Sequence, residues 1–101
     1  MDKATAIKIA KEYINFLTTS FDIESAILFG SYARGNYHDD SDIDIAIILE
    51  RGNDIIDTQA EMMKLRRKID LRIEPHPFFK KDFNHNNPVV NEILQQGIYI
   101  K

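Results

Sequence analysis

Two stretches of sequence decide the fold, and a short polar segment separates them. The first is an apolar run that ends in a glycine-serine turn, and the second is an apolar strand that carries two aspartates. The two stretches are Leu28-Phe29-Gly30-Ser31-Tyr32-Ala33-Arg34-Gly35 and Ser41-Asp42-Ile43-Asp44-Ile45-Ala46-Ile47-Ile48-Leu49. Together they predict a turn of the size that holds a phosphate group, beside a strand with paired carboxylates.

The two aspartates are predicted to lie on one side of their strand. Successive side chains of a β-strand point to opposite faces, so Asp42 and Asp44 share a face while Ile43 and Ile45 share the other. Like charges this close repel each other, and a cation between them offsets that cost. Oxygen ligands on a rigid strand suit Mg²⁺, which keeps several waters and often completes its shell with substrate phosphates. The pattern therefore predicts Mg²⁺ together with a nucleoside triphosphate.

The Gly30-Ser31 pair is predicted to provide the phosphate-binding half of the site. It lies where a short buried strand turns into a short helix, and glycine allows the backbone to approach a ligand closely. The first amides of a helix and the Ser31 hydroxyl can donate to a phosphate oxygen. Arg34 lies one helical turn later and can contact a phosphate or pair with Asp39 or Asp40, so it is not assigned to the site.

The spacing of these residues carries a resemblance to a known family. Gly30-Ser31, then ten residues, then Asp42-x-Asp44 resembles the signature of the DNA polymerase β-like nucleotidyltransferase superfamily, and specifically of its minimal, MNT-type members. The resemblance implies an α/β (α+β) fold, in which a small mixed β-sheet is flanked by helices. It also implies an enzyme that uses two Mg²⁺ ions to move a nucleoside monophosphate, AMP from ATP in the first instance, onto an acceptor hydroxyl.

A third carboxylate is expected on a neighbouring strand, because the superfamily uses one. Apolar and charged residues alternate over residues 69–74, which predicts a strand with Asp70 and Glu74 on one face. The two acids would lie about 13 Å apart along such a strand, so one metal pair cannot use both. The resemblance favours Asp70 as metal ligand and proton acceptor, with Glu74 as the alternative. Asp70 could instead only pair with neighbouring arginines on an exposed face.

The rest of the chain is predicted to form the scaffold. Apolar residues recur at helical spacing over residues 3–18 and again from about 54 to 68, and a helix at the second place could connect two parallel strands. Residues 91–96 predict a last helix, which Gly97 stops before a terminal strand or docked tail. The sheet is expected to mix parallel and antiparallel strands.

The segment from residue 75 to residue 88 is predicted to be irregular. Its prolines and asparagines disfavour regular structure, while its three phenylalanines are too apolar for open solvent. They are expected to cover the core, with a wall for a nucleotide base as the alternative. His76 and His85 have no histidine or cysteine partner at zinc-site spacing, so they are expected to be surface or loop histidines.

Composition limits the classes of protein that fit. The chain has 101 residues, of which 44% are hydrophobic, and this predicts a single domain over residues 1–101. A net charge of −3 gives no basic surface for a polynucleotide, so no nucleic-acid partner is expected. There is no cysteine and no long apolar run, so neither disulfides nor a membrane span are expected and a cytoplasmic location is the default.

The acceptor is the part of the function that these residues do not identify. The resemblance implies that a partner supplies the acceptor site, through self-association or through a helical HEPN-type protein of a toxin–antitoxin pair, in which the nucleotidyltransferase is the antitoxin. Some such antitoxins transfer AMP to a tyrosine of the partner. Two alternatives stay open. One is an adenylyltransferase for small molecules of the antibiotic-modifying type, and the other is a non-catalytic nucleotide-binding module that masks its partner.

Overall fold

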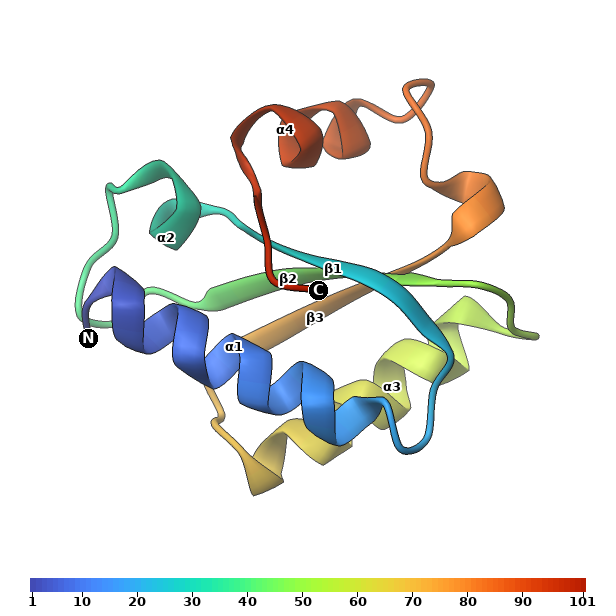
Figure 1. The fold of residues 1–101 in the computed structure, drawn as a ribbon, viewed down its shortest axis with the longest axis horizontal. Coiled ribbons are helices and arrows are strands. Elements are labelled where there is room, and N and C mark those ends of the chain that lie inside the picture. The colour runs from blue at the N-terminus through green and yellow to red at the C-terminus, as the bar shows by residue number, and fades with distance from the viewer.

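The computed structural model describes residues 1–101 as a four-stranded sheet with helices on both faces (Figure 1). No helix combines the length and the apolar character needed to cross a bilayer. The elements in chain order are α1 (Lys3–Leu17), β1 (Ile23–Phe29), α2 (Ser31–Arg34), β2 (Ile43–Leu49), α3 (Ile55–Leu65), the 3-10 turn η1 (Arg66–Lys68), β3 (Ile73–Phe79), the 3-10 turn η2 (Lys80–Asp82), α4 (Pro88–Gln96) and β4 (Ile98–Tyr99).

The sheet mixes strand directions, as predicted. Its order is β3-β2-β1-β4, with β1 antiparallel to both of its neighbours and β2 parallel to β3. Parallel neighbours need a crossover connection, and α3 provides it. The predicted α/β class, a small mixed sheet flanked by helices, is confirmed.

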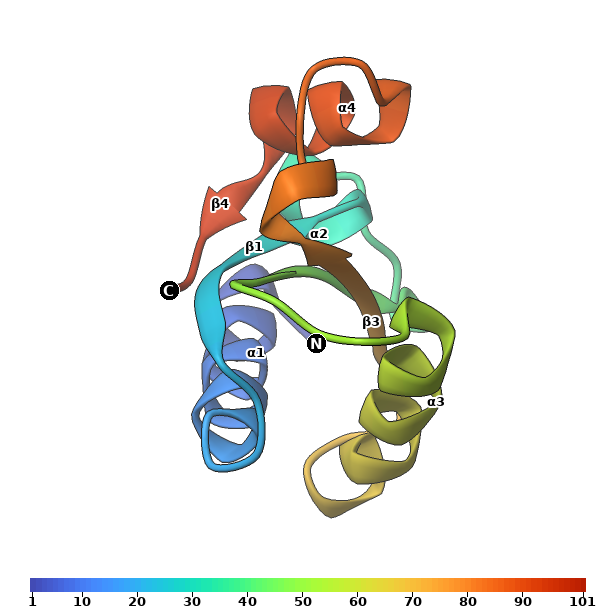
Figure 2. The ribbon, with the colours of Figure 1, turned by 90° about the vertical axis from the view of Figure 1, so that its right-hand side faces the viewer.

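One face of the sheet carries most of the core. Helices α1 and α3 both lie on this face, and α4 lies on the other (Figure 2). A cluster of fifteen buried residues joins α1 and α3 to the sheet. The Tyr13 hydroxyl of α1 donates to the Met62 carbonyl of α3 at 2.7 Å, which ties the two helices together inside this cluster. We call this face the α1/α3 face.

The opposite face, the α4 face, has a smaller core. Four buried residues meet there, Ile27, Ala46 and Ile48 from the sheet and Ile93 from α4. Phe78 and Phe83 pack against them with their rings in an edge-to-face arrangement, 5.2 Å between centroids. Phe79 packs instead against the larger cluster. The expectation that the phenylalanines cover the core is therefore confirmed.

The third strand begins later than the sequence predicts. The predicted strand over residues 69–74 is wrong at its start, because β3 begins at Ile73 and Asp70 lies in the preceding turn. The Asp70 carboxylate accepts the Arg72 backbone N–H at 2.9 Å, and the Ile69 and Asp70 amides donate back to Arg66. Such local side-chain to backbone bonds compete with strand pairing, which explains the difference.

The prediction of an irregular segment over residues 75–88 is wrong for its first five residues, because β3 runs through Pro75 and Pro77 to Phe79, whereas residues 80–87 form a 3-10 turn and a loop as predicted. The strand lies at the edge of the sheet and pairs only with β2. The two prolines are at alternate positions, so both of their backbone nitrogens face away from β2. The absence of an N–H group there costs no hydrogen bond between the strands. The Pro75 carbonyl on that side accepts from the Gln59 side chain of α3 at 3.2 Å.

The predicted helices are confirmed with small changes at their ends. Residues 66–68 form a 3-10 turn after α3 rather than its last α-helical turn. Helix α4 begins at Pro88, earlier than predicted, because Asn87 caps it by accepting the Val89 N–H at 2.9 Å and proline suits the first helical turn. The chain then ends in the short strand β4, antiparallel to β1.

Candidate active site

The glycine-serine turn lies directly against the second aspartate. Phe29, the last residue of β1, pairs with Asp44 in the antiparallel register, so Gly30 follows at the same end of the sheet. Gly30 has φ +75° and ψ −154°, a conformation that is open essentially only to glycine. A Cβ atom there would lie 2.4 Å from the Asp44 Oδ2. Glycine is therefore required both by the turn and by the approach to the carboxylate.

The start of helix α2 differs from the start of every longer helix in the chain. Helices α1, α3 and α4 are capped at their N-termini by Asp2, Asp54 and Asn87, whose side chains accept hydrogen bonds from the first backbone N–H groups of each helix. No side chain caps α2. Since the first amides of a helix have no intrahelical partner, those that begin at Ser31 are open to an external acceptor. An oxyanion such as a phosphate satisfies this requirement.

The second aspartate lies where the alternation predicts. Asp44 is the second residue of β2 and projects on the α4 face, opposite Ile43 and Ile45. Asp42 immediately precedes the strand and is exposed. Asp44 is 26% exposed in its side chain. The carboxylate pair thus remains open to solvent although the strand that carries it is otherwise buried.

The two candidates for the third carboxylate have different positions. Glu74 pairs with Asp44 in the parallel register of β2 and β3, and its Oε1 accepts from Arg66 at 3.2 Å. Asp70 lies in the turn before β3, where its two oxygens accept from the Arg72 guanidinium at 3.0 and 2.7 Å. Those hydrogen bonds from Arg72 lower the pKa of Asp70. Glu74 is therefore the acid that β3 places beside Asp44.

A further residue at this site is His76, which the sequence reasoning assigned to an irregular loop. It lies on β3 two residues after Glu74, and its Nε2 is 3.1 Å from the Asp44 Oδ1. The side chain is 38% exposed. The signal that could have found it is the alternation of Glu74, His76 and Phe78 on one face, which becomes visible only once the prolines between them are accepted as part of a strand.

Arg34 is not directed at the carboxylates. The ion pair considered for it with Asp39 or Asp40 is wrong, because its Nη1 lies 3.5 Å from the Oε1 of Glu92 on α4. Asp39 instead lies 3.9 Å from the amino terminus. His85 also lies away from the site and its Nδ1 is 2.8 Å from the Asn91 Oδ1, as expected of a loop histidine.

The residues present fit a magnesium ion that substrate oxygens complete. No group of three or more histidine, cysteine, aspartate or glutamate side chains converges closely enough to hold a metal by itself. Mg²⁺ does not require such a group, since one or two carboxylates together with phosphates are its usual ligands in nucleotide sites. The pair Asp42 and Asp44, with the uncapped start of α2 beside it, provides that partial set.

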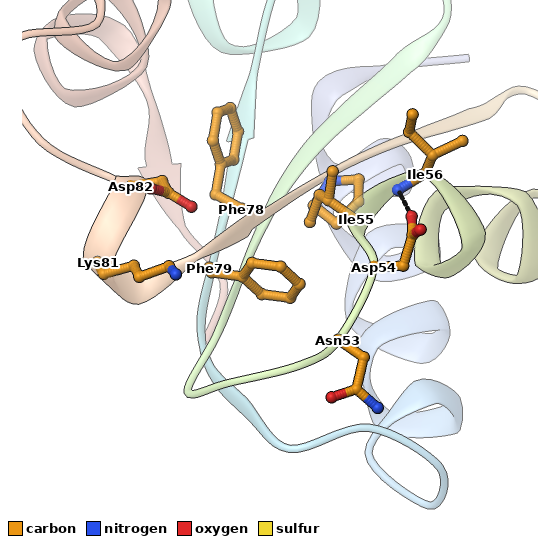
Figure 3. Close-up of a pocket in the computed structure, with 9 residues that line it drawn as sticks. Asn53, Asp54, Ile55, Ile56, Phe78, Phe79, Lys81 and Asp82 are labelled. Atoms are coloured by element: carbon orange, nitrogen blue, oxygen red, sulfur yellow. Dashed lines mark hydrogen bonds between the residues drawn. The ribbon is translucent and has the colours of Figure 1, made fainter.

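A groove lined by two phenylalanines lies at the other end of the sheet. It has a volume of about 500 Å³ and lies between the start of α3 and the end of β3 (Figure 3). Phe78 and Phe79 line it from β3, and Ile55 and Ile56 line it from α3. Because β2 and β3 are parallel, this groove is at their carboxyl ends, whereas the aspartates are at the amino end of β2. The candidate site is thus an open surface and does not coincide with this groove.

The sequence was compared with the profiles of known protein families. The profile of the family described as "Polymerase beta, Nucleotidyltransferase" matches residues 11–101. The chain belongs to the polymerase beta nucleotidyltransferase family. It is therefore a nucleotidyltransferase, and the predicted resemblance is confirmed.

Individual relatives agree with the family. The chain is 36% identical over 97 residues to the "Putative protein adenylyltransferase MJ0604" of Methanocaldococcus jannaschii, an alignment that covers 89% of this chain and 92% of that protein. A nucleotidyltransferase structure from Sulfolobus solfataricus shares the fold with a TM-score of 0.69 at 24% identity, over 96% of this chain and 80% of that one. A toxin–antitoxin structure with AMP-PNP gives a TM-score of 0.68 at 25% identity, over 90% and 72% of the two chains.

Proposed function

We propose that this nucleotidyltransferase transfers AMP from ATP to a hydroxyl group of a partner protein, with pyrophosphate as the leaving group, in a reaction that depends on Mg²⁺. The observation that carries the proposal is the contact between the Gly30 turn and Asp44, which brings an open set of helix amides beside a pair of carboxylates. A triphosphate needs both at once, because its oxygens require donors and its charge requires a cation.

Each residue has a distinct part in this proposal. The backbone amides at Gly30 and Ser31 and the Ser31 hydroxyl bind phosphate oxygens and orient the triphosphate. Asp42 and Asp44 would hold the Mg²⁺, which when bound neutralises phosphate charge and lowers the pKa of the acceptor hydroxyl. The protein's own contribution is to position the phosphorus for in-line attack, and that positioning accounts for a large share of rate enhancement in such sites.

The third carboxylate remains a choice between two acids, and the strand register supports Glu74. Side chains opposite each other on neighbouring strands are about 5 Å apart, so Glu74 can reach a metal held by Asp44. Asp70 would first have to release its bidentate contact with Arg72. We expect Glu74→Gln to reduce transfer more than Asp70→Asn, and the reverse order would restore Asp70 as the third acid.

A protein acceptor is supported by the relatives. The Methanocaldococcus jannaschii protein carries the name of a protein adenylyltransferase, and two of the similar solved structures are toxin–antitoxin assemblies. By this reasoning the chain acts as an antitoxin, and its partner is a helical HEPN-type protein that carries the acceptor hydroxyl. The net charge of −3 gives no attraction to a nucleic-acid acceptor.

The test is a transfer assay with the chain and the product of its neighbouring gene, purified together. Radiolabelled ATP should label the partner polypeptide in the presence of Mg²⁺. Asp42→Asn and Asp44→Asn should each reduce labelling by about 100-fold or more, as expected for loss of a charge-stabilising group. Asp40→Asn, an exposed carboxylate in the same loop, is the matched control and should label normally.

Other outcomes of the same assay separate the alternatives. Label that appears only on an added hydroxylated small molecule would indicate a small-molecule adenylyltransferase. Binding and neutralisation of the partner without any label, unchanged in Asp44→Asn, would indicate a non-catalytic module. Either result would overturn the proposed protein adenylylation.

A further inference from the structure

We infer that His76 is a positioning residue of this nucleotidyltransferase, which orients the Asp44 carboxylate for the metal-bound triphosphate through a hydrogen bond from Nε2. The inference rests on the proposed function and goes beyond it, because the side chain comes from the edge strand β3 rather than from the Gly-Ser or Asp-x-Asp motifs. Its basis is the way the imidazole ring lies across the sheet.

The side chains of His76 and Phe29 meet above β2. The centroids of their rings are 5.0 Å apart, in an edge-to-face arrangement, although Phe29 is on β1 and His76 is on β3. Strands β1 and β3 are not neighbours, so about 10 Å of sheet separates their backbones. The residue of β2 that pairs with His76 is Ala46, which is completely buried. Its methyl group leaves room for the two side chains to meet.

The Asp44 carboxylate lies between His76 and the Gly30 turn. Its Oδ1 atom is 3.1 Å from the His76 Nε2, and its Oδ2 atom is close to the Gly30 backbone, where a Cβ would come within 2.4 Å. A hydrogen bond at one oxygen and a close neighbour at the other restrict the rotation of the carboxylate. Its direction is therefore set by the protein before a ligand arrives, which reduces the ordering cost of binding.

The chemistry of the pair favours a role at the site over a role in the core. Both side chains are partly exposed, at 38% for His76 and 26% for Asp44, so the bond does not serve to satisfy deeply buried groups. Carboxylates that bind metals are commonly held by such outer hydrogen bonds, and loss of one typically weakens metal binding by about 10–100-fold.

Two substitutions of His76 distinguish the contribution of its hydrogen bond from that of its ring packing. Gln carries an amide nitrogen at the same number of bonds from Cβ as Nε2, so His76→Gln retains a donor but loses the ring. His76→Phe retains the edge contact with Phe29 but loses the donor. His85→Phe is the matched control, since this exposed histidine bonds to Asn91 away from the site.

The experiment measures binding of Mn²⁺, as an EPR-visible substitute for Mg²⁺, in the presence of a non-hydrolysable ATP analogue. His76→Phe should bind Mn²⁺ about 10–100-fold more weakly than wild type, and His76→Gln should stay within about threefold of it. Wild-type binding by His76→Phe, or equal losses in both variants, would overturn the inference. If the wild-type chain itself binds no Mn²⁺ with the analogue, the proposed function fails first and the inference with it.

A measurement on the wild-type chain keeps the inference testable if His76→Phe does not fold. The ring ¹⁵N shifts of neutral His76 distinguish the two tautomers, and a donor at Nε2 requires the proton there. We expect the Nε2–H form in the free protein. A dominant Nδ1–H form would remove the donor and overturn the inference, whatever the behaviour of the variants.

Discussion

The α1/α3 face of the sheet buries a cluster of fifteen residues, whereas the α4 face buries a cluster of four. Both faces belong to the same strands, and alternate residues of β2 serve one or the other. Ile43, Ile45 and Ile47 lie in the large cluster, while Ala46 and Ile48 lie in the small one. Asp44 shares the face of the small cluster but stays partly exposed.

Because the two faces are buried unequally, one face of β2 mainly stabilises the fold and the other carries residues of the candidate site. A fully covered face gains most of the hydrophobic stabilisation, which is roughly proportional to the apolar area removed from water. A sparsely covered face contributes less, but it leaves Asp44, Glu74 and His76 open to a ligand. In this small nucleotidyltransferase, substitutions on the α1/α3 face should therefore change stability, and those at the open end of the α4 face should change activity.

The largest expected effect is that of Gly30→Ala on activity. The added methyl group would meet the Asp44 carboxylate at 2.4 Å, so nucleotidyl transfer should fall by about 100-fold or more as the phosphate-binding turn moves away from Asp44. Initial rates of label transfer measure this loss.

Gly35→Ala provides the matched control for that prediction. Gly35 also has a positive φ, +88°, but a Cβ there would meet nothing within 4 Å. Both variants should lose about 1–3 kcal/mol of unfolding free energy through backbone strain, while only Gly30→Ala loses transfer. Comparable activity in the two variants would show that the Gly30 contact with Asp44 does not matter for the reaction.

The next largest effect is the loss of stability when a buried isoleucine of β2 is replaced, and it should differ between the neighbours Ile47 and Ile48. Ile47 and Ile48 are 0% and 3% exposed, and they point into the large and the small cluster respectively. Replacement of a buried isoleucine by alanine costs about 2–5 kcal/mol, depending on how well the site can collapse. We expect the loss of unfolding free energy to be at the upper end of this range for Ile47→Ala and at the lower end for Ile48→Ala. Urea unfolding measures both losses. Equal losses would contradict the unequal contribution of the two faces.

The parts of the fold that are set by local signals could be predicted from the sequence. The glycine turn before a short helix, the alternation of Asp42 and Asp44 with isoleucines, and the helical periodicity of α1 and α3 each depend on residues close together in the chain. The helix between the second and third strands was compatible with a parallel pair, and a sheet of mixed direction was expected. These predictions covered the half of the site that the Gly-Ser and Asp-x-Asp motifs supply.

The rest of the site depends on long-range pairing, and the bounds of the strand that carries it were predicted wrongly. Two prolines in β3 disfavour a strand unless it is at an edge, and nothing local shows that it is. The alternation around Asp70 resembled a strand, but the hydrogen bonds that Arg72 donates to the Asp70 carboxylate close a turn instead. The proximity of His76 to Asp44 follows from the pairing of His76 with Ala46, which only the assembled sheet determines.

A smaller effect is expected from the hydrogen bond between the two helices of the α1/α3 face. Tyr13→Phe removes the 2.7 Å bond to the Met62 carbonyl and should lower the free energy of unfolding by about 1 kcal/mol. Tyr99→Phe, at an exposed position, is the matched control and should change nothing.

The burial of Tyr13 also predicts how the stability of the fold changes at alkaline pH. Burial raises the pKa of Tyr13 above its ordinary value of 10.0, so the unfolded chain loses this proton before the folded chain does. Stability should therefore fall as pH rises above about 10, and part of that slope should be missing in Tyr13→Phe. Urea midpoints measured across this range test it, and identical alkaline slopes in the two proteins would contradict the burial of an un-ionised phenol.

The smallest effect is expected at Asp70, at the entrance to β3. The hydrogen bonds from Arg72 lower the pKa of Asp70, so this carboxylate stabilises the fold when ionised and loses that contribution as pH falls from about 4 through its folded-state pKa. Asp70→Asn should thus be slightly less stable than wild type at neutral pH, because Arg72 is 43% exposed and water screens the pair. Once the pH is below the folded-state pKa of Asp70 the two proteins should converge, since both then carry an uncharged side chain at this position. Urea midpoints from neutral to acidic pH measure the difference, with Asp40→Asn as an exposed control. A difference that stays constant down to low pH would mean that the turn is held by packing rather than by the charge of Asp70.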